Sequence, residues 1–170
     1  MKRARFVLAL VAAFIAGCSD DVPTADATVD AAADVDLTVH CDADLPADAS
    51  SPEPTFANVR SFFLRRCAAG AACHGPGGQG GLALTGASLH ADLVGHPSRM
   101  FPVLPRVAPG NPDRSFLWLK VTGCFAQLPG CRAPGGTCGD PMPTLSPISE
   151  GFSLPEAAVV RAWIVAGAPP

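Results

Sequence analysis

The chain has 170 residues, a formal net charge of -3, 18 prolines, 17 glycines and 7 cysteines. This length leaves room for one domain of about 100–150 residues, which excludes a multidomain enzyme. The charge is unevenly distributed: three basic residues stand in 1–18, ten acidic and no basic residues in 19–54, and nine basic against five acidic residues in 55–170. We therefore expect three segments of different physical character.

The N-terminal segment has the features of an export signal. Three basic residues precede a short apolar run over 6–15, and small residues then lead to Cys18. This order is typical of a secretory signal, and about ten apolar residues are too few for a permanent membrane span. The ending Ile15-Ala16-Gly17-Cys18 resembles the bacterial lipobox, which implies a lipoprotein signal peptide at 1–17 and a lipid on Cys18. An ordinary signal peptide with an incidental cysteine is the alternative.

Residues 18–54 are expected to form a lipidated, acidic and disordered tether. Their Asp, Ala, Pro, Thr and Ser residues offer too little apolar surface to offset the entropy of ordering. Like charges also repel one another and extend such a chain. His40-Cys41 raises the possibility of a metal site, although a solvated tether with one cysteine is the simpler interpretation. The protein is thus expected to be exported and membrane-anchored, facing the periplasm or the cell surface.

The remaining residues, 55–170, are predicted to form one mostly helical domain with long loops. Thr55 is a suitable cap for a first helix, and Ser153-Leu154-Pro155-Glu156 forms a capping box for the last. Few segments have the alternation of strands. The predicted helices run from Thr55 to Arg66, from Ala87 to Val94, from Asn111 to Gly123 and from Ser153 to Gly167.

The first predicted helix leads into two cysteines and a histidine. Cys67 and Cys73 are followed directly by His74, which is the logic of c-type haem attachment: two thiols bind the haem vinyl groups and the histidine ligates the iron. The usual spacer has two residues, whereas here there are five, four Ala and one Gly. A loop of such small residues could carry both sulfurs to a haem, or it could let them close a disulfide.

Further ordered pieces follow this motif: Gly80-Gly81-Leu82-Ala83-Leu84, Pro109-Gly110-Asn111-Pro112, Pro141-Met142-Pro143 and Ala162-Trp163-Ile164. Together they resemble the small cytochrome c-like domains of exported planctomycete and myxobacterial proteins, over roughly residues 60–168. The resemblance implies a class I cytochrome c fold whose first and last helices cross beside the haem. By position, it implies that Cys67 and Cys73 attach haem c covalently and that His74 and Met142 are the axial iron ligands. The sequence departs from the family pattern at the cysteine spacing and at Ala83, where Asp is usual.

Met142 has features of a ligand without the family. Prolines on both sides restrict its backbone to extended conformations, so that the thioether stands on a stiff loop. Methionine with histidine is a common ligand pair of electron-transfer haem. A loop methionine packed on the core is the alternative. Met100, His90 and His96 are possible substitutes as the distal ligand, although His90, in a predicted helix, and His96, beside Pro97, are more simply interpreted as surface residues.

Four cysteines are then left: Cys41, Cys124, Cys131 and Cys138. Thiols in an exported protein usually form disulfides, and the spacing matches no zinc site. Four cysteines allow three pairings. A bridge within 124–138 would stiffen the loop that carries Met142 and leave Cys41 to pair with the remaining cysteine. Without haem, Cys67 and Cys73 would form a third disulfide.

Two functions follow from these observations. The first is a lipid-anchored c-type cytochrome that transfers single electrons to a redox partner protein and is not an enzyme; a variant of it accepts electrons from a separate oxidoreductase chain. The second is a haem-less, disulfide-stapled module with an interaction or structural role. The Gly-rich loop over 75–81 lacks the Lys-Ser/Thr of a phosphate loop, and the acidic segment argues against a nucleic-acid partner.

Overall fold

A computed structural model describes Leu37, Val39, Cys41, Leu45 and the ranges 51–68, 73–131, 136–143 and 153–170. All of these belong to one unit, Asp36–Pro170; the predicted signal peptide and Cys18 lie outside the described residues. The helices are α1 (Phe56–Arg66), α2 (Leu89–Leu93), α3 (Phe116–Thr122) and α4 (Leu154–Val165), with the 3-10 turns η1 (Gln79–Gly81), η2 (Pro112–Arg114) and η3 (Cys124–Gln127). The described ranges contain no sheet, only isolated bridges between Val94 and Val107 and between Pro97 and Pro105. The prediction of a small, mostly helical and loop-rich domain is confirmed.

Helices α1 and α4 begin where the capping residues predict. The backbone N–H of Asn58 donates to the Thr55 hydroxyl at 3.3 Å. In the capping box of α4, the Glu156 N–H donates to the Ser153 hydroxyl at 3.4 Å, and the Ser153 N–H donates to the Glu156 carboxylate at 3.0 Å. These bonds satisfy backbone donors that the first helical turn leaves without partners.

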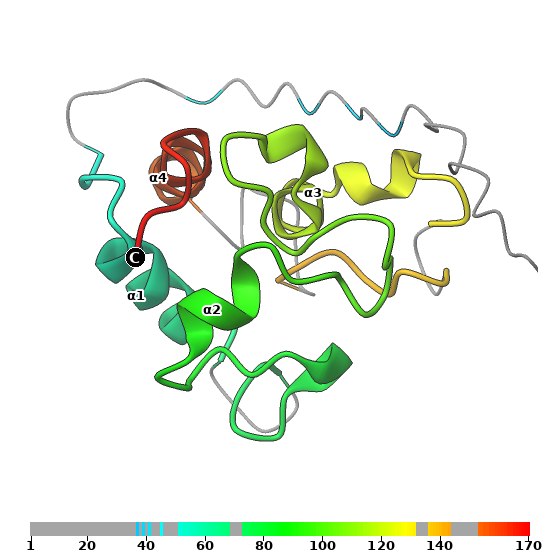
Figure 1. Cartoon of the computed structure of the whole chain (residues 1–170), viewed down its shortest axis with the longest axis horizontal. Coiled ribbons are helices and arrows are strands. Elements are labelled where there is room, and N and C mark those ends of the chain that lie inside the picture. Colours follow the sequence, from blue (N-terminus) through cyan, green and yellow to red (C-terminus); the bar gives the residue numbers. More distant parts are fainter. Residues whose placement is uncertain are drawn as a thin grey trace, which may run out of the picture. The chain divides into compact units, whose positions relative to one another are not determined.

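Helices α1 and α4 pack against each other (Figure 1). Phe63 of α1 and Trp163 of α4 are both fully buried. At the edge of this contact, Glu156 of α4 pairs with Arg65 at 3.3 Å and with Arg66 at 3.4 Å. Burial alone would raise the pKa of Glu156, but the Ser153 hydrogen bonds and the two guanidinium charges outweigh it and lower that pKa. The two ion pairs therefore connect α1 and α4 at the edge of their apolar contact.

Helix α3 begins later than predicted. Asn111 caps the 3-10 turn η2, not an α-helix. The buried Ser115 then interrupts the helical backbone, because its hydroxyl accepts from the Ala108 N–H at 2.9 Å and donates to the Asn111 carbonyl at 2.8 Å. The α-helix starts only at Phe116, and it ends as predicted at Gly123, whose φ of 79° is left-handed.

Two disulfides join the four remaining cysteines: Cys41 with Cys124, and Cys131 with Cys138. Leu37, Val39 and Cys41 are buried against the domain, although all three fall within the segment expected to be a tether. Two disulfides indicate an oxidising, extracytoplasmic location. In the parts of the chain that the structure describes, no helix has the length and apolar character needed to cross a bilayer.

Candidate functional site

A cavity of about 260 Å³ lies beside α3. Its wall is mostly apolar, with Leu82, Leu84, Phe116, Leu117 and Val121 among its residues. A concave apolar site with a few polar groups is the usual form of a ligand-binding pocket. Three of the residues predicted to contact a cofactor also line this cavity: Cys67, His74 and Met142.

The backbone after α1 folds His74 into the cavity wall. The His74 N–H donates to the Cys67 carbonyl at 2.9 Å, and the His74 carbonyl accepts from the Leu84 N–H at 2.7 Å. The imidazole Nδ1 lies 3.0 Å from the Leu82 carbonyl oxygen. Because a carbonyl can only accept, Nδ1 carries the proton and the lone pair of Nε2 is available to a metal. Most metal-binding histidines are oriented by a hydrogen bond of this kind, which the ring nitrogen that does not bind the metal donates.

Cys67 and Cys73 are both free thiols, although the other four described cysteines are in disulfides. Cys67 is buried in the cavity wall, whereas Cys73 is exposed. Burial is the main cause that raises the pKa of the Cys67 thiol to about 12, and the neighbouring Cys73 and Glu156 contribute to the same rise. The Cys67 thiol is therefore protonated at neutral pH, and Cys73 is the accessible member of the pair.

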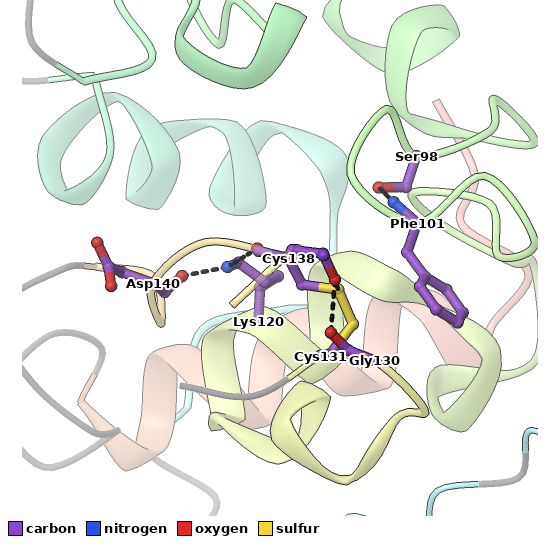
Figure 2. Close-up of a disulfide and its surroundings, with 8 residues drawn as sticks. Ser98, Phe101, Lys120, Gly130, Cys131, Cys138 and Asp140 are labelled. Atoms are coloured by element: carbon purple, nitrogen blue, oxygen red, sulfur yellow. Dashed lines mark hydrogen bonds between the residues drawn. A yellow bond between two sulfur atoms is a disulfide. The ribbon is translucent and has the colours of Figure 1, made fainter. Parts of the chain in front are cut away.

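Met142 stands on a short loop opposite α3. The Met142 N–H donates to the Lys120 carbonyl at 3.0 Å, and the bond between Met142 and Pro143 is cis. The same loop begins at Cys138, which the disulfide joins to Cys131 (Figure 2). The loop that carries the Met142 thioether is thus attached covalently, through Cys138, on its N-terminal side.

Lys120 also lines the cavity, and no feature of the sequence singled it out. Its side chain is buried, and its ammonium donates to the Cys138 carbonyl at 2.8 Å and to the Asp140 carbonyl (Figure 2). The ammonium also lies 4.0 Å from the centre of the Phe125 ring, a cation–π distance. Burial lowers the pKa of Lys120 to about 8, an effect that the charge of Asp140 partly opposes. The sequence around Lys120 does not indicate these loop contacts, so Lys120 could be identified as a site residue only from the structure.

Two arginines add positive charge to the cavity wall, Arg99 and Arg106. The Arg106 guanidinium donates to the Asp92 carbonyl at 2.6 Å and to the Gly81 carbonyl at 3.2 Å. Because both acceptors are neutral main-chain groups, the positive charge of Arg106 remains uncompensated by them and favours an anionic group on a ligand.

The other candidate ligands differ in whether they line the cavity. Met100 lines the cavity with Met142, and 40% of it is exposed. His90 does not line it: its ring lies 4.9 Å from that of Phe56, and its Nε2 donates to the Ala168 carbonyl at 2.8 Å. His96 is exposed and is also absent from the lining. His90 and His96 therefore serve the packing and the surface rather than the cavity.

The alternative of a metal site at His40-Cys41 falls partly outside the described residues, which do not include His40, and Cys41 is in a disulfide. Among the residues that the structure describes, no three His, Cys, Asp or Glu side chains gather as a metal site. In comparisons with known proteins, no family model, no curated protein and no solved structure matches the chain. Its function must accordingly be argued from the chemistry of the cavity.

Proposed function

We propose that this chain is an exported, lipid-anchored c-type cytochrome-like protein that binds haem c and passes single electrons to a redox partner protein. The observation that carries the proposal is one apolar cavity whose wall contains the Cys67 thiol, the His74 imidazole and the Met142 thioether. Under this proposal no substrate is transformed, so the protein is an electron carrier and not an enzyme.

The Cys67 thiol, the His74 imidazole and the Met142 thioether of the cavity fit haem, whereas Cys73, the second predicted thiol, is exposed and is not among the lining residues. Cys67 and Cys73 would hold the porphyrin through thioethers, His74 would be the proximal ligand, and Met142 the distal one. When bound, haem supplies the one-electron couple of its iron. The chain contributes orientation and a mostly apolar setting: the Leu82 carbonyl fixes the tautomer of His74, and most of the cavity wall around it is apolar.

The charge around the cavity supports the same ligand. Haem carries carboxylate groups on an otherwise apolar ring, and the cavity combines an apolar wall with the guanidinium groups of Arg99 and Arg106. An anionic, flat and mostly apolar molecule matches this distribution better than a small polar metabolite does.

The fold also supports the proposal in outline. The packing of the first against the last helix agrees with the class I cytochrome c arrangement that the sequence resembles. The two disulfides agree with export, because they need an oxidising compartment. The lipid on Cys18 and the tether that follows it complete the proposed molecule.

The alternative is a haem-less module stapled by three disulfides. Its third disulfide would join Cys67 to Cys73, but both are free thiols, whereas the other two bridges are formed. Since the other four cysteines among the described residues are oxidised, the two unpaired thiols favour a role for Cys67 and Cys73 in binding.

Covalent haem is tested by expressing the full chain with a cytochrome c maturation system and staining a denaturing gel for haem. We expect a coloured band in the wild type that Cys67→Ala/Cys73→Ala abolishes. The matched control is Cys131→Ala/Cys138→Ala, which removes the same number of sulfurs and should stay coloured. A colourless wild-type band, with a Cys67–Cys73 disulfide found by mass spectrometry, would refute the proposal.

The distal ligand is tested by absorption spectroscopy of the oxidised protein. Met142→Ala should remove the spectral signature of methionine ligation, whereas Met100→Ala should preserve it. If only the second variant loses the signature, Met100 is the ligand and the assignment of Met142 is wrong.

A further inference from the structure

Lys120 is a buried cation whose hydrogen bonds go to the main chain. Only 7% of the residue is exposed, and the ammonium donates to the carbonyls of Cys138 and Asp140. A buried charge is costly unless its donors are satisfied. Two carbonyl acceptors and the Phe125 ring compensate for that cost here.

The acceptors of Lys120 lie on the loop that carries Met142. From the other side, the backbone of Lys120 contacts the same loop, since its carbonyl accepts from the Met142 N–H at 3.0 Å. One residue of α3 thus binds the loop at three points, through residues 138, 140 and 142. Figure 2 shows the ammonium lying between the Cys138 and Asp140 carbonyls.

The loop also passes close over the ammonium between these points. Gly139 has a left-handed φ of 66°, and a Cβ added to it would lie 3.9 Å from the Lys120 Nζ. The preceding residue is fixed by the Cys131–Cys138 disulfide. Beyond Cys138 the described part of the loop has no further covalent attachment, so its position there depends on hydrogen bonds.

We propose that Lys120 is a positioning residue for Met142. By binding the loop on both sides of Gly139, it keeps the thioether at the cavity wall and limits the places that Met142 can occupy. The inference rests on the proposed function in one respect, namely that Met142 is the distal ligand. A role in packing alone is the competing explanation, because Lys120 also contacts aromatic rings.

The variants that separate the two roles are Lys120→Met and Lys120→Arg. Methionine keeps most of the apolar length of the side chain and removes all its donors, whereas arginine keeps the charge and the donors. Arg161→Met, an exposed cation of α4, is the matched control for loss of a positive charge.

The first measurement is amide hydrogen exchange by NMR on the full chain without haem. In Lys120→Met we expect the protection of the Met142 amide to fall by about 10- to 100-fold, the range for losing hydrogen bonds to a charged group, with α4 amides unchanged. Lys120→Arg should restore part of the protection. Unchanged protection of Met142, or an equal fall for α4, would overturn the proposal.

The second measurement is the methionine-ligation signature of the haem-loaded protein, which Lys120→Met should weaken and Lys120→Arg should recover. If the wild type takes up no haem, the proposed function fails, while the exchange of the Met142 amide still decides the role of Lys120. If Lys120→Met does not fold, the wild-type ammonium is observed directly by ¹⁵N NMR. Slowly exchanging ammonium protons close to the backbone of residues 138–142 support the proposal, and their absence refutes it.

Discussion

The two disulfides should contribute very differently to stability, because they close loops of different size. The Cys41–Cys124 pair is separated by 83 residues and the Cys131–Cys138 pair by 7. The loss of loop entropy in the unfolded chain corresponds to about 4.5 kcal/mol for the first bridge and about 2.5 kcal/mol for the second at 25 °C. We therefore predict that Cys41→Ala/Cys124→Ala lowers the free energy of unfolding by about 2 kcal/mol more than Cys131→Ala/Cys138→Ala.

The comparison is made by urea unfolding of the full chain, with the wild type as reference. Each variant loses two sulfurs from buried or partly buried sites, so loop size is the main difference between the two variants. Removing the long bridge also frees the segment that carries Leu37 and Val39, which acts in the same direction. Equal destabilisation, or a greater loss in Cys131→Ala/Cys138→Ala, would refute the entropic argument.

Three further predictions concern single side chains. Glu156→Gln should lower the free energy of unfolding by about 1 kcal/mol at pH 7, a modest value because the two paired arginines are 54% and 44% exposed and solvent screens them. The pKa of Glu156 is lowered in the folded state, so this loss is present above pH about 4.5 and vanishes as the pH falls through the folded-state pKa. Urea unfolding of the wild type and the variant at several pH values would show this dependence. In the haem-free chain, iodoacetamide at pH 8 should label Cys73 before Cys67, because the Cys67 thiol is buried with a pKa of about 12; mass spectrometry showing the reverse order would contradict its burial. Trp163→Phe removes the 2.8 Å hydrogen bond from the indole to the Pro169 carbonyl. For the loss of this bond we expect the free energy of unfolding, measured by thermal unfolding, to fall by about 1 kcal/mol and the amides at the C-terminus to exchange faster.

The helix ends could be predicted because their signals are local. Thr55 and the Ser153–Glu156 box act within one turn of the residues they cap, so neighbouring sequence is sufficient. The start of α3 could not be predicted in the same way. There the backbone groups of Ala108 and Asn111 bind the Ser115 hydroxyl, and the strength of that local network decides against helix continuation.

The burial of Leu37, Val39 and Cys41 was hidden by the composition of the sequence around them. Averaged over 19–54, the acidic residues dominate, but Leu37, Val39 and Cys41 stand at every second position, the period of an extended strand with one apolar side. That short alternation was the available signal. The disulfide partner, Cys124, lies 83 residues away and could be narrowed only to one of three alternatives.

The candidate site was predicted in part. Cys67, Cys73, His74 and Met142 were singled out from the sequence; the structure brings Cys67, His74 and Met142 to one cavity wall, and Cys73 is exposed and does not line it. The supporting residues were not found, because their roles depend on distant main-chain groups. Lys120 takes its partners from a loop about 20 residues further on, and no periodicity in α3 indicates that contact.

The two disulfides close two covalent rings within the chain. The larger ring runs from Cys41 to Cys124 and includes Cys67, Cys73 and His74, while the smaller ring closes between Cys131 and Cys138. Only residues 125–130 connect the rings. A protease cut anywhere in the larger ring would therefore leave both pieces of the chain linked until the Cys41–Cys124 bridge was reduced.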